Sequence, residues 1–181
     1  FKLASGPVGV MAATNESVSE AQLPMMIYVY GAVILLCLIS FRSLRATIAV
    51  VLPLYVVSTL AQALMVSLEI GLTVSTLPVI ALGVGIGVDY GIYILSSMSG
   101  LLRQGVPLTE AYRRALIERG SAVLFTGITL AVGVSTWVFS ALKFQMDMGI
   151  LLTFMFLVNM LGAVLLLPAL GTLLWRKKTS E

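Results

Sequence analysis

Residues 83–95 read GVGIGVDYGIYIL, a run of apolar and small residues that surrounds a single carboxylate, Asp89. The run belongs to an apolar stretch, residues 74–98, that exceeds the roughly 20 residues a helix needs to cross a bilayer. A charged side chain at the bilayer centre costs about 2.5–3.5 kcal/mol on insertion scales. Such residues usually face a bundle interior or a wet cavity, so Asp89 is predicted to take part in moving an ion or a proton.

The composition is that of an integral membrane protein. Of the 181 residues, 59% are hydrophobic and 10% are charged, whereas about 25% are charged in soluble domains. Four further stretches have the length of membrane spans: residues 24–41, 46–67, 121–142 and 148–174. The sequence therefore predicts an all-α bundle of five transmembrane helices, spanning residues 24–174. Pro53 and Pro168 are predicted to bend or end their helices.

The connecting charges predict the orientation. Nine basic residues fall in the connections on one side of the predicted spans, against two, Lys2 and Lys143, on the other. The nine are Arg42, Arg45, Arg103, Arg113, Arg114, Arg119, Arg176, Lys177 and Lys178. The positive-inside rule makes their side cytoplasmic, with residues 175–181 as a basic cytoplasmic tail. Residues 1–23 are then expected to be the end of a periplasmic domain leading into the cell inner membrane, in a chain that is a fragment of a longer protein.

The longest cytoplasmic connection contains a predicted amphipathic helix, residues 107–119. Its apolar residues recur at helical spacing. They are Leu108, Ala111, Tyr112, Ala115 and Leu116. Glu110–Arg114 and Arg114–Glu118 have the spacing of i,i+4 ion pairs, and Gly120 is typical of the residue that ends a helix. A helix lying on the inner membrane surface and a solvated basic connector both fit this pattern.

The third predicted span has two distinct faces. Small residues recur every four positions on one face, which predicts close packing of another helix. They are Gly83, Gly87 and Gly91. Asp89 shares the other face with Gly85, Tyr93 and Ser96, and Tyr90 lies beside it around the helix. Taken alone, each tyrosine fits packing or interface anchoring as well as chemistry.

The fourth predicted span carries a second polar stripe. Thr126, Thr129 and Thr136 fall on one helical face together with Gly133 and Ser140. Such a face can pack tightly or can carry hydrogen bonds toward a buried acid. With Tyr93, the three threonines are candidates for a polar face that supports Asp89.

Several site types are absent from the sequence pattern. The chain has no histidine and one cysteine, Cys37, so a His-based metal site is excluded and no metal is expected. No nucleophile–base pair is recognisable, and the sequence therefore predicts that the protein is not an enzyme.

The order of these features resembles the C-terminal membrane half of the resistance–nodulation–division (RND) transporters, and most closely their MmpL-like branch of predicted lipid exporters. The resemblance rests on an outside domain, five spans with GVGIGVDYGI in the third, a basic amphipathic connector and a Thr/Gly-rich fourth span. It implies one half of a pseudo-two-fold, twelve-span protein, with the core fold of sterol-sensing domains. Asp89 and Tyr90 match the family's Asp-Tyr pair in the tenth span, whose counterpart lies in the N-terminal half.

The resemblance also implies a function. Protonation of Asp89 or its counterpart from outside, followed by release inside, would drive export or inter-leaflet transport of lipids or other hydrophobic molecules. H⁺ would be the coupling ion, with no other cofactor. The expected partners are membrane lipids, the hydrophobic substrate and the protein's N-terminal half, with no nucleic acid. RND relatives include trimers, dimers and monomers, so the resemblance leaves homo-oligomer formation open.

Two alternatives share this architecture. A protein-translocation motor of the SecD/SecF type also has an intramembrane Asp, although the DYGIY sequence at Asp89 differs from the DAN-like continuation of that group. A sterol- or lipid-sensing regulator that does not pump would use Asp89 only as a structural residue.

Overall fold

The computed structural model describes residues 7–70 and 76–175, and every regular element in these ranges is helical. The elements are α1 (Pro7–Phe41), α2 (Leu44–Ser67), α3 (Leu77–Arg103), α4 (Leu108–Ala115), a π-helical turn η1 (Leu116–Gly120), α5 (Ser121–Ser135), a 3₁₀ turn η2 (Thr136–Phe139) and α6 (Lys143–Trp175). Five helical stretches in the described ranges are long and apolar enough to cross a membrane. They are Ala12–Phe41, Leu44–Ser67, Pro78–Arg103, Leu108–Phe139 and Lys143–Gly171. The predicted all-α bundle with five membrane spans is confirmed.

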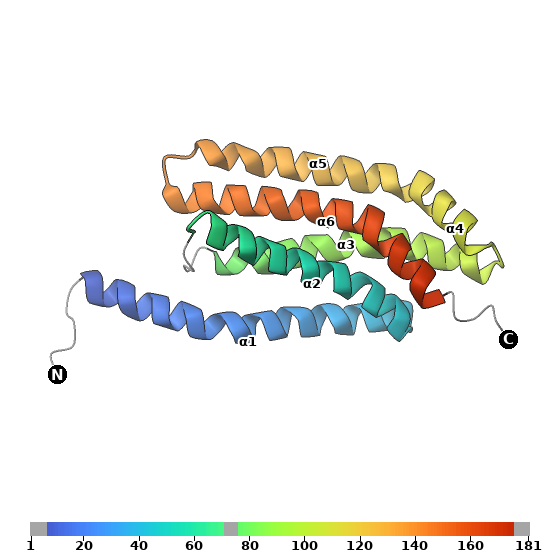
Figure 1. Cartoon of the computed structure of the whole chain (residues 1–181), viewed down its shortest axis with the longest axis horizontal. Helices are drawn as coiled ribbons and strands as arrows, with labels where there is room; N and C mark the ends of the chain where they lie inside the picture. The colour runs from blue at the N-terminus through green and yellow to red at the C-terminus, as the bar shows by residue number, and fades with distance from the viewer. Residues whose placement is uncertain (1–6, 71–75, 176–181) are drawn as a thin grey trace.

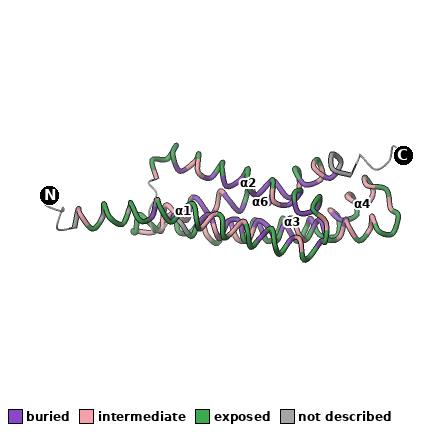
Figure 2. The backbone as a smooth tube through the Cα atoms, turned by 90° about the horizontal axis from the view of Figure 1, so that it is seen from below, coloured by how far each residue is buried: buried purple, intermediate pink, exposed green. Residues whose placement is uncertain are grey.

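The long helices lie side by side, and the chain reverses direction from each one to the next (Figure 1). α6 packs against α2, α3 and α5, while α3 also packs against α1 and α2. α3 and α6 are the most buried spans, whereas Leu108–Phe139, which includes α5, is mostly exposed. α1 is also mostly exposed (Figure 2). Many exposed side chains in the second half of α1 are large and apolar, as in a helix that faces lipid. They include Ile27, Leu35, Leu36 and Ile39.

The charged connections fall at opposite ends of the bundle. The α1–α2 turn and the α3–α4 connection lie together at one end (Figure 1), and they carry Arg42, Arg45 and Arg103. The other end carries Glu69 and Lys143. This is the segregation of charge on which the orientation prediction depends. Lys2 and most of the predicted basic tail, including Arg176, Lys177 and Lys178, lie outside the described residues.

The first helix is longer than its predicted span. α1 begins at Pro7, so residues 7–23, predicted as a lead-in from a periplasmic domain, continue the membrane helix without a break. Proline is well tolerated at the first position of a helix, and the following residues include three alanines and two glutamates, which favour helix. Pro24 lies inside this helix. Residues 1–6, and residues 74–75 of the third predicted span, lie outside the described ranges.

The amphipathic connector packs on the protein. Its apolar face joins the main core, where Ala111 and Ala115 are fully buried, and α4 packs against α3. The apolar face of this helix therefore contacts α3, and the interpretation in which that face lies on the membrane surface is wrong. The predicted helix end at Gly120 is also wrong, because Gly120 has helical dihedrals and the helix continues through η1 into α5.

The π-helical turn also changes the predicted ion pairs. Arg114 Nε contacts Glu110 Oε1 at 2.9 Å, as the i,i+4 spacing predicts, and Arg113 joins the same carboxylate. Glu118 lies in the wider η1 turn and accepts a hydrogen bond of 3.0 Å from Ser97 of α3. A π turn no longer keeps residues four apart on one line, so the predicted Arg114–Glu118 pair does not form among the described residues.

A hydrogen bond joins the connector to α6, at a carbonyl that a proline leaves without its helical donor. Pro53 and Pro168 both lie inside continuous helices, and Figure 1 shows α6 bending toward its red C-terminal part. Proline has no N–H, so the carbonyl of Val164, four residues before Pro168, has no helical donor. Tyr112 Oη of α4 donates a hydrogen bond to this carbonyl at 2.7 Å.

We expect Tyr112→Phe to lower the unfolding free energy by about 1 kcal/mol, because it leaves the Val164 carbonyl without a donor. The effect should shrink in a Pro168→Ala background, since alanine supplies an N–H to that carbonyl. Thermal unfolding of the purified full-length protein in detergent measures both changes. Tyr28→Phe is the matched control, because Tyr28 is 77% exposed on α1 and makes no hydrogen bond in the described part of the chain. Equal losses in both backgrounds would contradict the assignment.

Candidate functional site

Asp89 lies close to the middle of the third membrane span. α3 runs from Leu77 to Arg103, so 12 residues separate Asp89 from its first residue and 14 from its last. At about 1.5 Å per residue these separations correspond to roughly 18 and 21 Å along the axis. In a hydrocarbon core about 30 Å thick, both distances place the carboxylate near mid-depth.

The face of α3 that carries Asp89 is uncovered. Gly85, Asp89, Tyr93 and Ser96 are all exposed, and Tyr93 is 56% exposed although it is aromatic. No hydrogen bond or ion pair joins Asp89 to another of the described residues. An ionised acid at this depth, without a partner and on an open face, is unfavourable in a bilayer.

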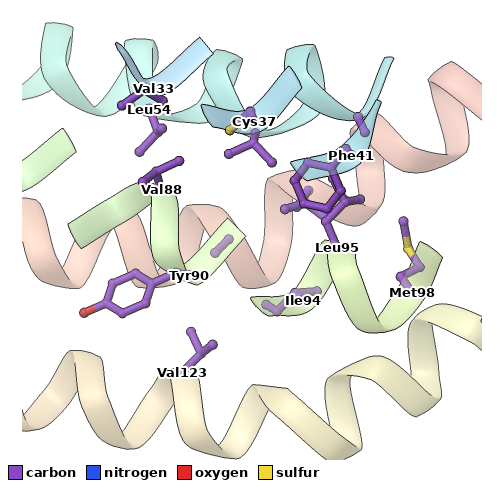
Figure 3. Close-up of a cluster of buried hydrophobic side chains, with 14 of the residues drawn as sticks. Val33, Cys37, Phe41, Leu54, Val88, Tyr90, Ile94, Leu95, Met98 and Val123 are labelled. Carbon is purple, nitrogen blue, oxygen red and sulfur yellow. The ribbon is translucent and has the colours of Figure 1, made fainter. Parts of the chain in front are cut away.

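Tyr90 points into the bundle. Its side chain is 2% exposed and belongs to the main core cluster. Figure 3 shows the ring between α3 and the helix that carries Val123. Its hydroxyl oxygen is buried and has no hydrogen-bond partner among the described residues. A buried hydroxyl that lacks a partner costs about 1–3 kcal/mol, so this group calls for a functional explanation or a bound water.

The glycine face of α3 lies against α6 and α2. Gly83, Gly87 and Gly91 are buried. A Cβ added at Gly83 would overlap Met155, and one at Gly87 would lie 2.5 Å from Asn159 Cγ and 2.6 Å from Leu54 Cδ2. A Cβ at Gly91 would lie 3.0 Å from Val50 Cγ1. The helices approach so closely because these positions have no side chain.

An amide fixes this contact. Asn159 of α6 is 4% exposed and donates a hydrogen bond from Nδ2 to the Gly83 carbonyl at 2.9 Å. Its bond to a backbone oxygen of α3 could not be foreseen, because the register of α6 against α3 is set by packing. The result is that one side of α3 is fixed and the opposite side, with Asp89, is open.

The threonine stripe lies apart from Asp89. Thr126, Thr129 and Thr136 are exposed, and their segment packs chiefly on α6. Thr136 Oγ1 donates to the Gly133 carbonyl at 2.7 Å, within its own helix. Within the described residues, no hydrogen bond joins the three threonines, or Tyr93, to Asp89. Asp89 and Tyr90 are neighbours in the sequence, but their side chains lie on different sides of α3: Asp89 is exposed and Tyr90 is buried.

This arrangement suits proton binding. Protonation of Asp89 removes the charge that makes its depth unfavourable, so the local environment of α3 depends strongly on whether a proton is bound. Tyr90 places a hydroxyl with unused hydrogen-bonding capacity next to it in the chain. No other Asp or Glu occurs between Glu69 and Glu110, so this span offers a single carboxylate for such chemistry.

Comparison with known sequences gives consistent matches. Residues 4–180 match the sequence profile of the MMPL family. A membrane protein of Methanocaldococcus jannaschii is 27% identical over 93% of this chain and 43% of its own length. The "Probable transport protein MmpL12" of Mycobacterium tuberculosis is 27% identical over 96% of this chain. The "Sulfolipid-1 exporter MmpL8" of the same species is 33% identical over 52% of this chain.

The chain spans only part of these relatives. Its match covers 15% of the length of the MmpL12 protein and 9% of the length of the sulfolipid exporter. The activity of a whole protein of that kind therefore involves much more sequence than the five spans described above.

Gly87→Ala is expected to lower the unfolding free energy by about 1–3 kcal/mol, since its methyl group overpacks a fixed contact. Leu54 can move its terminal methyl, but Asn159 is held by its bond to Gly83 and cannot easily withdraw. Thermal unfolding of the full-length protein in detergent tests this. Gly31→Ala on α1 is the control, because a Cβ there meets nothing within 4 Å. Equal stability of the two variants would show that α3 and α6 are not in this close contact.

Proposed function

Because this chain belongs to the MMPL family, we propose that the whole protein uses the proton-motive force to export lipids or other hydrophobic molecules, or to move them between leaflets. The predicted resemblance to MmpL-like transporters is confirmed at the level of the family, and two of the relatives are named as a probable transport protein and an exporter. The proton relay, the coupling and the substrate class are the proposed parts.

The observation that carries the proposal is the position of Asp89. A carboxylate lies near mid-depth on an open face of α3 and has no partner among the residues that the structure describes. Leaving that face against lipid would be unfavourable, so another part of the protein must cover it. The family pattern supplies a candidate, the N-terminal half with its own Asp-Tyr helix. Asp89 would then lie at the contact between the two halves.

Protonation would change that contact. A charged Asp89 requires a polar or charged partner across the interface, whereas a neutral Asp89 does not. The two states therefore favour different placements of α3 against its neighbour. One elementary charge crossing the membrane potential is worth about 2.3 kcal/mol per 100 mV. Tyr90 is the second proposed member of the relay, because its buried hydroxyl has unused hydrogen-bonding capacity, although it points to a different side of α3 from Asp89.

Orientation and substrate belong to the same proposal. The end of the bundle with Arg42, Arg45 and Arg103 would be cytoplasmic, and α1 would enter from the periplasmic side of the inner membrane. H⁺ is the proposed coupling ion, with no further cofactor. The name of the sulfolipid exporter favours a lipid or similarly hydrophobic substrate here. Membrane lipids, the N-terminal half and further copies of the protein are the proposed partners.

Asp89→Asn is expected to abolish proton flux, because the amide keeps the shape of the side chain but cannot bind and release a proton. Full-length protein in liposomes with an entrapped pH-sensitive dye measures the decay of an imposed pH gradient. The variant should decay at the rate of protein-free liposomes. Asp147→Asn is the matched control, since it makes the same substitution near the start of α6 and should retain wild-type flux.

Insertion must be shown separately. Both variants should elute as folded protein, because Asn has nearly the size and shape of Asp and Asp89 makes no hydrogen bond within the described residues. Proton flux of folded Asp89→Asn within twofold of the wild type would exclude Asp89 as the coupling residue. The sensing function would then account better for the same fold.

A further inference from the structure

A groove of about 940 Å³ opens at the arginine-rich end of the bundle. It lies between the turn that joins α1 to α2 and the last turns of α3, at the end shown on the right of Figure 1. Its volume is in the range of ligand sites, about 300–1,000 Å³. It is separate from the middle of α3, because its residues on that helix begin at Ser96 and end at Arg103.

The groove is basic and its charges are uncompensated. Arg45 and Arg103 are its charged lining residues, and none of its 11 lining residues is acidic. Neither arginine forms an ion pair within the described parts of the chain. Two cations that share one groove repel each other, and an anion between them removes that repulsion. The lining therefore favours a negatively charged ligand.

Hydroxyl donors complete the polar side. Ser40, Ser43 and Ser99 line the groove, and their hydroxyls make no hydrogen bonds to other described residues. Ser43 precedes α2 without capping it, so the first N–H groups of α2 also lack a side-chain acceptor at this end. Arginine forks together with hydroxyl donors are the usual partners of phosphate oxygens.

The remaining lining is apolar. Phe41, Leu44 and Leu102 share the groove with the arginines, and Leu44 is 69% exposed. Arg45 lies near the start of α2 and Arg103 at the end of α3. The ends of apolar spans are where the headgroups of a bilayer lie. A ligand that fits both halves of this lining has an anionic head and an apolar tail.

We propose that this groove binds the phosphate of an anionic phospholipid from the leaflet at the arginine-rich end. Arg45 and Arg103 hold the phosphate oxygens, the serine hydroxyls donate to it, and Leu44 and Leu102 contact the start of the acyl chains. Basic pockets between membrane helices are known to select anionic lipid headgroups. The site does not depend on Asp89 and is separate from the proposed transport cycle.

Native mass spectrometry of the full-length protein, released from phosphatidylcholine nanodiscs with a minor fraction of phosphatidylglycerol, tests the site. We expect wild type to retain phosphatidylglycerol preferentially. Arg45→Gln and Arg103→Gln should each lower its relative affinity about fivefold, and the double variant about 25-fold, because each removes one of the two cations that line the groove. Arg45→Lys with Arg103→Lys keeps both charges and should recover most of the preference.

Arg119→Gln is the matched control. Arg119 is exposed in η1 near the same end, but it does not line the groove, so its loss should leave lipid retention unchanged. An equal loss in this variant would reduce the effect to general surface charge and overturn the proposal. If soluble glycerol phosphate displaces the lipid at equal concentration, the groove recognises a free phosphate ester and the proposed phospholipid site is wrong. Unchanged lipid retention in the double variant, together with a lower unfolding temperature, would show that a segment of the protein fills the groove.

Discussion

The unfavourable desolvation of one carboxylate governs the arrangement of the third span. Asp89 lies near mid-depth, where ionised groups are costly, and the described chain offers it no compensating bond. A neutral residue there would leave α3 an ordinary core helix, since its other faces already pack on α1, α2 and α6. The acid instead makes one face of α3 unfavourable to place against lipid.

The two sides of α3 differ in packing: the glycine side is in close contact with α6 and α2, and the Asp89 side is exposed. On the glycine side, Met155, Asn159 and Leu54 occupy the space that Cβ atoms would need, and the amide bond of Asn159 to Gly83 sets the register. That contact leaves little freedom for α3 to slide along α6. On the Asp89 side, Gly85, Asp89 and Tyr93 make no side-chain hydrogen bond or ion pair to another helix within the described ranges. Asp89 therefore lies on the open face of α3, opposite the face that is fixed against α6.

Much of this could be predicted from the sequence, because a bilayer imposes simple requirements. Span length, the glycine repeat and the segregation of arginines each follow from a single physical rule, and the helices were expected on that basis. The failures have a common cause. The apolar face of residues 107–119 fits lipid or protein equally well, and only the position of α3 decides that Ala111 and Ala115 are buried in protein. Likewise, the inward direction of Tyr90 depends on where α5 lies.

The connector between the third and fourth spans is hydrogen-bonded to both α3 and α6. Tyr112 donates to the Val164 carbonyl that Pro168 leaves free on α6, and Glu118 accepts from Ser97 on α3. The two bonds lie six residues apart on one continuous helical stretch. A relative shift of α3 and α6 must therefore stretch one bond or bend the stretch between them. The π turn at Leu116–Gly120 lies within that stretch, and its wider, less regular hydrogen bonding is where such bending costs least.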